Sequence, residues 1–486
     1  MQAETLPNTL MFIGGAWVAS HSGRNYPLFN PATGRVLTHV PKGDSEDVNA
    51  AVDAAERAFE GSEWRGMDPS KRGRLMNKVA QGLRDRLAEF ARLETLNNGK
   101  PLGQAKGDMA MTARHFEYFA GLADKIQGST IPVPGNRLDY TLKEPLGVTA
   151  HVVPWNYPLV MAARSMAPAL AAGNTVVAKP ASFTPLTLLR FAELCKQAGM
   201  PDGVVNVLTG GGDEVGGTLV RHPKVRLTAL TGSVETGMQV MELASANLSR
   251  VILELGGKNP HIVFSDADLE KAAAAVLSGI FTNAGQMCWA GSRLLVEEGI
   301  KDELLRKVVD GAEGMKVGDG LDPGTAMGPL VAESQRERVE KYVKIGVGEG
   351  ATIAAGGAPP DEEQLRGGYF YRPTVLDGVT QDMKVAQEEI FGPVLTVTTF
   401  NGREDALAKA NDSSYGLWAG VWTKDLKKAH TVAKELESGI VAVNEEPITF
   451  PQTPFGGFKN SGNASEQGMD AVSAYVRVKN VSVNLD

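Results

Sequence analysis

Three side chains in this sequence, Cys288, Asn156 and Glu254, could together carry out acyl chemistry on a carbonyl group. The thiol of Cys288 lies in the glycine-containing stretch "NAGQMCWAG", between the large apolar residues Met287 and Trp289. A thiolate can attack a carbonyl carbon and form a covalent intermediate. Asn156, in "PWNYP", offers an amide donor for the oxyanion that develops, and Glu254, in "LELGGKNP", offers a carboxylate base.

Each of these residues also has an ordinary structural interpretation when it is taken alone. A cysteine in a turn can simply pack, Asn156 can cap the helix that follows, and Glu254 can be a solvated carboxylate at a strand end. The other cysteine, Cys195, shares a helical face with Leu188 and is predicted to be a small buried hydrophobic residue. Cys288 lies on no such apolar stripe, which keeps a chemical role open for it.

Apolar strands that alternate with helices must position these groups. The predicted strands are 148–153, 174–179, 203–208, 225–230, 251–255 and 261–264. Strands separated by helices form a parallel, doubly wound sheet, and such sheets bind ligands at the carboxyl ends of their strands. Asn156 and Glu254 both fall at such ends, so we expect them to face a common site.

Other local patterns predict further elements. A hairpin with Gly-Gly at its turn is expected over 11–18. Helices are expected over 45–59, with Ser45 as N-cap, and over 71–97. A third helix is expected to have Thr184 as N-cap, Pro185 as its first residue and Gly199 as C-cap.

The bulk properties of the 486-residue chain limit the possible classes of function. The length predicts two or three domains, and the net charge of −8 argues against a nucleic-acid or anionic-membrane surface. Two cysteines cannot form a disulfide framework, which suits a reducing compartment. The first residues, "MQAETLPNTLMFIGGAWV", lack the features of a signal peptide, and no apolar run is long enough for a membrane span. We therefore expect a cytoplasmic protein without nucleic-acid or membrane partners and without a metal site.

The sequence resembles the aldehyde dehydrogenase superfamily over nearly its whole length. The segments that carry the resemblance, in the family's order, are "FNPATGRV", "PWNYP", "VVAKPASFTP", "LTGSVETG", "LELGGKNP", "GQMCWAG", "EEIFGPV" and "PFGGFKNSG". The resemblance implies an α/β fold with a Rossmann-like, parallel-sheet NAD(P)-binding domain (1–122 and 146–253). It also implies an α/β catalytic domain that carries the nucleophilic cysteine (254–456). A small β arm (123–145 and 457–486) would mediate assembly into a homodimer or homotetramer.

The resemblance also assigns roles to the three reactive residues. Cys288 would attack the aldehyde and form a thiohemiacetal, and hydride transfer to a nicotinamide would then leave a thioester. Asn156 and the N–H of Cys288 would stabilise the oxyanion, and Glu254 would activate the hydrolytic water. Relatives that transfer the acyl group to coenzyme A lack this glutamate, so a free carboxylic acid is the expected product. A catalytically inactive relative with a binding or structural role and a cofactor-independent esterase are the alternatives.

The cofactor is expected to be NAD, with NADP as a possibility. The positions implied by the resemblance are Val153, Pro154, Trp155, Lys179, Ser182, Gly212, Gly216, Ser233, Leu255, Glu389 and Phe391. Ser233 follows a strand and opens a helix, where free backbone N–H groups can meet a pyrophosphate. Strict NAD users of the family often have a glutamate at the position of Ser182, where it repels a 2′-phosphate. The serine removes that repulsion.

The substrate is expected to be a non-phosphorylated aliphatic or aromatic aldehyde. The channel positions implied by the resemblance are Tyr157, Met161, Arg164, Met287, Trp289, Thr449, Phe450 and Phe455, most of them large and apolar. The alternative for Met287 and Trp289 is that both pack inward. Arg164 matches an arginine that binds the distal carboxylate in succinic semialdehyde dehydrogenases, but Thr282 replaces their second arginine. A semialdehyde is therefore the second choice. Near the C-terminus, "NASE" keeps Glu466 but lacks the family's neighbouring arginine.

Overall fold

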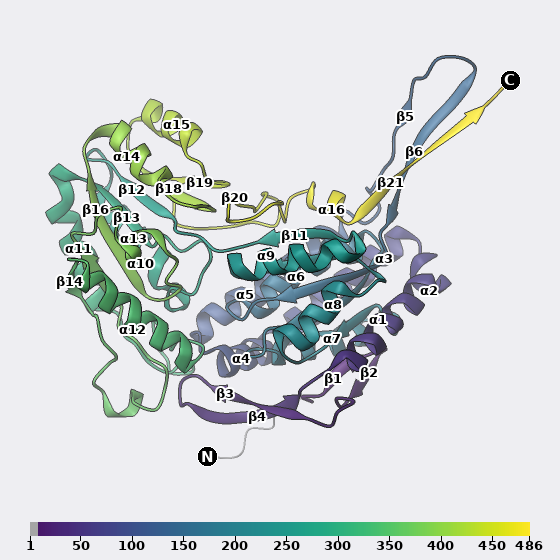
Figure 1. Cartoon of the computed structure of the whole chain (residues 1–486), viewed down its shortest axis with the longest axis horizontal. Coiled ribbons are helices and arrows are strands. Elements are labelled where there is room, and N and C mark those ends of the chain that lie inside the picture. Colours follow the sequence, from purple (N-terminus) through teal and green to yellow (C-terminus); the bar gives the residue numbers. More distant parts are fainter. Residues whose placement is uncertain (1–7) are drawn as a thin grey trace.

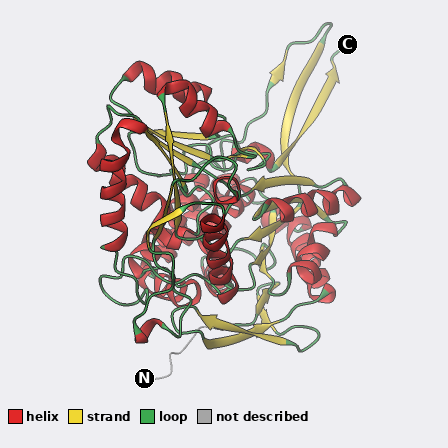
Figure 2. Cartoon of the chain, turned by 60° about the vertical axis from the view of Figure 1, so that its left-hand side comes forward, coloured by secondary structure: helices red, strands yellow, loops and turns green. Residues whose placement is uncertain are grey.

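The computed structural model describes residues 8–486, in which two α/β lobes and a projecting β arm can be distinguished (Figure 1). Each lobe is built around a seven-stranded sheet with helices packed against it, as the view by secondary structure shows (Figure 2). The fold class predicted from the alternation of strands and helices is confirmed. The expectation about a signal peptide rests partly on residues 1–7, which lie outside the described part of the chain.

The first sheet carries the strands that precede Asn156 and Glu254. Its order is β11 (Arg250–Glu254), β10 (Val225–Thr231), β7 (Val148–Val153), β8 (Thr175–Pro180), β9 (Val205–Val207), β1 (Met11–Ile13) and β2 (Ala16–Val18). The first five are mutually parallel, and β1 and β2 add an antiparallel hairpin at one edge. Because β10 lies between β7 and β11, the carboxyl ends of β7 and β11 are separated by the width of this one strand.

Nine helices accompany the first sheet within the described residues. They are α1 (Ser45–Glu60), α2 (Ser62–Arg65), α3 (Pro69–Asp85), α4 (Leu87–Asn98), α5 (Leu102–Ala120), α6 (Pro158–Ala171), α7 (Leu186–Gln197), α8 (Thr218–Arg221) and α9 (Val234–Ala244). Every residue of β8 is buried, as expected for a parallel strand that is covered on both faces. Cys195, on α7, is 1% exposed and belongs to this core, as predicted.

The second sheet follows the first in the chain and supports Cys288. Its order is β14 (Thr352–Ala355), β15 (Thr374–Asp377), β16 (Val394–Phe400), β13 (Arg293–Glu297), β12 (Pro260–Val263), β18 (Trp418–Trp422) and β19 (Ile440–Val443). Its helices are α10 (Leu269–Phe281), α11 (Lys301–Glu313), α12 (Glu333–Gly348), α13 (Lys384–Gln387), α14 (Gly402–Asn411) and α15 (Leu426–Glu435). All strands are parallel except β14.

The arm pairs a segment from the middle of the chain with its C-terminal strand. It comprises β5 (Thr130–Ile131), β6 (Arg137–Pro145) and β21 (Val476–Asn484), with β6 central and antiparallel to both. Figure 1 shows it extending away from both lobes. The remaining elements are the hairpin β3 (Asn25–Asn30) and β4 (Arg35–Pro41), the pair β17 (Tyr415–Gly416) and β20 (Phe458–Lys459), and α16 (Ala471–Ala474). No helix among residues 8–486 is both long and apolar enough to cross a bilayer.

The structure corrects four predictions about helix ends, one of which is the C-cap of α7, where Ala198 takes the place expected for Gly199. The N-cap of α1 is Asp44 and not Ser45, because Asp44 and Asp47 form a reciprocal capping box. Pro185 is the N-cap of α7 and not its first residue. The hydroxyl of Thr184, predicted to cap that helix, instead donates to the carbonyl of Trp155 at 3.4 Å.

The sequence predicts a single helix over 71–97, but the structure has two helices there, α3 and α4. Arg86 leaves the helical conformation, with φ −116° and ψ 20°. Its guanidinium contacts Glu89 and Gln197, the latter on α7.

Candidate active site

A cavity of about 420 Å³ lies where the carboxyl ends of β7 and β10 face the second lobe. It is lined by residues 154–156, by residues 231–235, by Gly256 and Cys288, and by parts of the second lobe around α12 and Phe391. Asn156 and Cys288, which are far apart in the sequence, therefore share one cavity. A larger hollow of about 540 Å³, near Lys316 and Arg372, contains no cysteine.

Cys288 follows a tight turn at the end of α10. Asn283, Ala284 and Gly285 all have left-handed backbone angles, with φ values of 50°, 54° and 72°. Two consecutive non-glycine residues in this region carry backbone strain, which the surrounding contacts must offset. A Cβ at Gly285 would lie only 2.1 Å from the carbonyl oxygen of Gly392, so this turn packs directly against the loop that precedes β16.

The thiol of Cys288 is partly exposed to the cavity, yet its surroundings disfavour the thiolate. Burial raises the pKa of Cys288 to about 12, and the positive charge of Arg164 opposes this rise only in part. The thiol is therefore protonated at neutral pH, and it must lose its proton during the attack.

Two residues of the segment 254–260 fix the backbone of Cys288. The side chain of Asn259 donates to the carbonyl oxygens of Cys288 and Ala290, both at 2.9 Å. A Cβ at Gly257 would lie 2.4 Å from the carbonyl oxygen of Cys288, so a glycine is needed for this close approach. The sequence prediction missed Asn259, although it lies within the quoted "LELGGKNP" segment.

Asn156 is 4% exposed, and both its side chain and its backbone carbonyl are hydrogen-bonded. Its side-chain nitrogen donates to the carbonyl oxygen of Gln286 at 2.9 Å, and its own carbonyl accepts from Lys100 and Asn283 at 2.9 and 3.0 Å. A primary amide carries two hydrogens, so the second remains able to donate to a ligand beside Cys288. The N–H of Cys288 makes no hydrogen bond to any residue in the described part of the chain.

Glu254 ends β11 and is 1% exposed. Neither of its carboxylate oxygens has a hydrogen-bond partner among the described residues. Burial raises its pKa well above the usual value, and the nearby carboxylate of Glu466 raises it further, whereas Arg164 lowers it. A carboxylate whose pKa is raised in this way is a stronger proton acceptor than an ordinary glutamate. Its charge also acts on the thiol of Cys288, which shows that the two groups are near each other.

Arg164 does not present a free guanidinium to the cavity. It forms a buried ion pair with Glu466, lies 4.4 Å above the ring of Phe455 and donates to Thr231 at 3.3 Å. The retained Glu466 thus has a partner on α6, although its neighbouring arginine is absent. Because the charge of Arg164 is already paired inside the protein, it cannot serve as an unsatisfied clamp for a substrate carboxylate.

The remaining substrate positions fall into two groups. Tyr157, Met161 and Trp289 are half-buried, and Trp289 contacts Phe455 edge to face at 5.8 Å. Met287, in contrast, is 5% exposed and packs in the core of the second lobe, so we assign it to packing instead of the channel wall.

Phe450 and Thr449 lie in a loop near the C-terminal segment. Phe450 is 46% exposed at a turn, and neither it nor any of the other predicted channel residues lines the cavity of 420 Å³ at Cys288. Thr449 contacts the side chain of Gln467 at 2.9 Å.

The second lobe presents Glu389 and Phe391 to the cavity. Glu389 accepts a hydrogen bond from the N–H of Gly257 at 3.0 Å, and burial raises its pKa to about 7. Phe391 has a left-handed φ of 60° and meets Trp155 edge to face at 5.1 Å. A Cβ at Gly256 would lie 2.3 Å from Glu389, so the two segments can approach closely only because this residue is a glycine.

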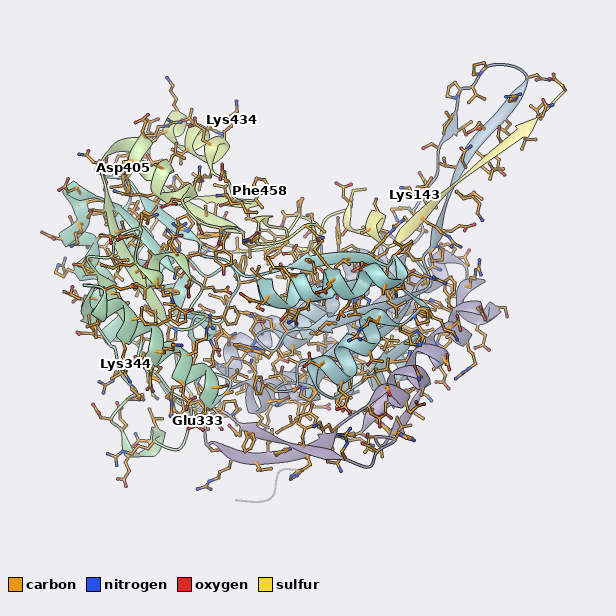
Figure 3. All side chains as sticks on the ribbon, in the orientation of Figure 1. Lys143, Glu333, Lys344, Asp405, Lys434 and Phe458 are labelled. Atoms are coloured by element: carbon orange, nitrogen blue, oxygen red, sulfur yellow. The ribbon has the colours of Figure 1, made fainter. Side chains whose placement is uncertain are left out.

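One face of α12 holds this loop, a contribution that the sequence prediction missed. Gln335 donates to the carbonyl of Phe391 and Arg338 to that of Glu389, both at 2.7 Å. The opposite face of α12 is exposed, and Figure 3 shows Glu333 and Lys344 on the outside of the molecule. The long-range contacts of α12 left no recognisable motif in the sequence.

The first lobe supplies the features expected of a dinucleotide site. Ser233 caps α9 by accepting from the N–H of Thr236, which leaves the other first-turn N–H groups at the cavity. Gly212 and Gly216 lie in a π-helical turn, Gly212–Gly217. Lys179 is 5% exposed and approaches Gly216, and Ser182 donates to Gly210 at 3.0 Å. The side chains of Val153 and Leu255 are buried in the cores.

Comparison with known proteins found a matching family and similar sequences. Residues 17–481 match the model of the aldehyde dehydrogenase family. The chain is 45% identical to hydroxyisobutyraldehyde dehydrogenase of Mycolicibacterium austroafricanum, covering 99% of this chain and 95% of that protein. It is 44% identical to betaine aldehyde dehydrogenase of Bacillus subtilis, covering 98% and 97%.

Solved structures of relatives superpose on most of the chain. An NAD⁺ complex of betaine aldehyde dehydrogenase from Staphylococcus aureus has a TM-score of 0.97 at 41% identity, covering 99% of this chain and 95% of that one. An NAD⁺ complex of an aldehyde dehydrogenase from Bacillus cereus has a TM-score of 0.96 at 44% identity, covering 99% and 97%.

Proposed function

Because the chain belongs to the aldehyde dehydrogenase family, it is an NAD-dependent enzyme that oxidises aldehydes, and we propose that Cys288 is its nucleophile. The observation that carries this proposal is that Cys288 and Asn156 line one cavity beside the expected cofactor segments, while the charge of the buried Glu254 acts on the Cys288 thiol. A binding protein without activity would have no need for a buried glutamate without hydrogen-bond partners next to a cysteine. The experiment that tests the proposal is replacement of Cys288, which opens the Discussion.

The residues at the cavity fit NAD. The N-terminus of α9, capped by Ser233, can meet the pyrophosphate, and the close approach of Gly256 to Glu389 brings a carboxylate to the position expected for a ribose. The edge-to-face pair of Trp155 and Phe391 bounds the space in which the nicotinamide would lie. Bound NAD supplies the hydride acceptor.

The residues of this chain perform the remaining steps. The sulfur of Cys288 attacks the aldehyde carbon, its proton leaves to solvent, and the carbonyl oxygen becomes an oxyanion. The side-chain amide of Asn156 and the N–H of Cys288 donate to that oxyanion, which stabilises the thiohemiacetal. After oxidation to the thioester, Glu254 takes a proton from water, which adds to the acyl carbon. The sulfur then leaves and the carboxylic acid is released.

We propose that the substrate is a non-phosphorylated, uncharged aliphatic or aromatic aldehyde. Arg164 is paired with Glu466, so the channel offers no free cation to the carboxylate of a semialdehyde. The same guanidinium covers one face of Phe455, and the Phe455 ring is therefore less able to bind a quaternary ammonium group. The named substrate of hydroxyisobutyraldehyde dehydrogenase is uncharged, whereas that of betaine aldehyde dehydrogenase, at nearly the same identity, is cationic. The choice therefore rests on the pairing of Arg164.

A pair of substrates of equal shape tests the role of charge. We expect 3,3-dimethylbutanal to have a kcat/KM at least about tenfold higher than betaine aldehyde, in which a quaternary nitrogen replaces the quaternary carbon. The physical reason is that the cationic substrate would meet Arg164 in place of a free aromatic face. Initial rates of NADH formation measure both constants, with hexanal as a reference. A preference for betaine aldehyde would contradict the proposal.

We also propose that NADP can replace NAD, because Ser182 and Lys179 lie near the glycine turn. Burial lowers the pKa of Lys179 to about 8, so its positive charge is present below that pH and is lost above it. The KM for NADP should therefore rise more steeply than the KM for NAD between pH 7 and pH 9. Ser182→Glu should raise the KM for NADP at least about tenfold through like-charge repulsion.

The KM for NAD serves as the control in the same variant. It should change little, because NAD has no 2′-phosphate to repel the new carboxylate. An equal rise for both cofactors would mean that the substitution only disturbs the loop, and the proposed role of Ser182 would fail.

Assembly into a homodimer or homotetramer through the arm, the cytoplasmic location and the residue boundaries of the three domains stay predictions. The arm carries exposed apolar side chains on its strands, among them Leu138, Leu142 and Val478. Exposed apolar residues on a projecting element are typical of a surface that another chain covers.

A further inference from the structure

The ammonium group of Lys100 is buried beneath the loop that carries Asn156. Lys100 follows the C-terminal end of α4, where Gly99 has a left-handed φ of 95°, and the lysine is only 1% exposed. Its nitrogen lies 2.6 Å from Asp108 and 3.7 Å from Glu94. An unpaired ammonium in the interior is strongly destabilising because it has lost its water, and here two carboxylates offset that cost.

The same ammonium contacts two consecutive residues of the active-site loop. It donates to the carbonyl oxygen of Asn156 at 2.9 Å and lies 4.0 Å from the centre of the Tyr157 ring. These two residues lie between β7 and α6, outside any regular element that could fix their peptide groups. One charged group thus fixes a backbone carbonyl and an aromatic face at once.

Neutral amides complete the support of this carbonyl. Asn283 donates to it at 3.0 Å, and Asn98 donates to the preceding carbonyl, that of Trp155, at 2.8 Å. Asn283 belongs to the strained turn before Cys288, so the loop of Asn156 and the turn of the nucleophile share a set of buried hydrogen bonds. Lys100 is the charged member of that set among the described residues.

We propose that Lys100 is a positioning residue for the proposed oxyanion site: its ammonium holds the Asn156 and Tyr157 backbone so that the Asn156 amide faces Cys288. The inference rests on the proposed function, because it presupposes that Asn156 stabilises the oxyanion. Lys100 touches neither the sulfur nor the aldehyde in this assignment. It acts through Asn156, and its removal should therefore slow only the steps that need the oxyanion donor.

A purely structural lysine would behave differently, and the chain offers a matched control. Arg72 is also a buried cation that donates to a backbone carbonyl, that of Ala171 at 3.1 Å, and it lies over the ring of Trp64. It contacts the C-terminal end of α6, whereas Lys100 acts beside the N-terminal end. Arg72→Met should therefore lower stability without slowing the first turnover.

The test is a double-mutant cycle between Lys100→Met and Asn156→Ala, read as the burst rate of NADH formation in the full-length enzyme. Asn156→Ala alone should slow the burst about 10²–10³-fold, as removal of an oxyanion donor does elsewhere. Lys100→Met alone should slow it at least about tenfold. In the Asn156→Ala background, Lys100→Met should add less than about a twofold change, because residues that act as one unit are not additive.

Two further measurements separate positioning from general damage. The Kd for NAD and the rate of alkylation of Cys288 by iodoacetamide should be unchanged in Lys100→Met, since neither needs the oxyanion donor. Should Lys100→Met fail to fold, Asp108→Asn keeps the ammonium but removes the negative charge of its shortest contact. That variant should slow the burst several-fold, again only when Asn156 is present.

The outcomes distinguish this inference from the function on which it rests. If Asn156→Ala slows the burst but Lys100→Met does not, or slows it equally in both backgrounds, the positioning role is overturned and the proposed function stands. If Asn156→Ala has no effect on the burst, the oxyanion role of Asn156 fails, and the inference about Lys100 fails with it.

Discussion

Replacing Cys288 by alanine is expected to abolish aldehyde oxidation, with kcat falling at least about a thousandfold. Without the thiol no thiohemiacetal can form, and the aldehyde then has no tetrahedral alkoxide from which a hydride can readily leave. The measurement is NADH formation, both in the steady state and in the first turnover. A variant that kept a tenth of the wild-type rate would refute the assignment of the nucleophile.

The other cysteine supplies the control for this experiment. Cys195 is buried on α7 in the core of the first lobe, and burial raises the pKa of its thiol, so it is an inert packing residue. Cys195→Ala should cost some stability through the small cavity it creates but should keep nearly all activity. In Cys288→Ala, an unchanged Kd for NAD would show that the cofactor site remains folded.

Replacing Glu254 by glutamine should stall the enzyme after oxidation. The first burst of NADH should be kept, about one per active site, while the steady-state rate falls about 10²–10⁴-fold because no base activates the hydrolytic water. Stopped-flow absorbance resolves the two phases, and the burst amplitude is the internal control for folding and cofactor binding. A steady-state rate equal to that of the wild type would remove Glu254 from the mechanism.

The same residue predicts a pH dependence. Burial and the neighbouring Glu466 raise the pKa of Glu254 well above its ordinary value, and only the ionised form can accept a proton from water. The deacylation rate should therefore be low at acid pH and rise as the pH passes through this raised pKa. This rise should be absent from the residual activity of Glu254→Gln, since glutamine does not titrate. A rise that persisted in the variant would assign the titration to another group.

Much of the fold could be predicted because its signals are local. The strand segments 148–153 and 225–230 are continuous apolar runs, and the structure has β7 and β10 there. Helix starts were predicted less well, since Asp44 and Ser45 are equally good caps by type and only the contact with Asp47 distinguishes them. At the break, Arg86 contacts Gln197 of α7, and no pattern within 71–97 encodes that contact.

The sequence by itself determined the resemblance to the family, the α/β fold class and the need for a nicotinamide cofactor, because eight short segments in a fixed order identify them. Only the tertiary structure decided how the charges in and around the site are paired. Arg164 matched a substrate-binding arginine, but in the folded chain Glu466, from the far end of the sequence, neutralises it. Lys100 belonged to no quoted motif, and its contact with Asn156 exists only because α4 packs beneath the loop. Burial and ion pairing depend on which distant segments meet, and that information lies in the packing of the whole chain.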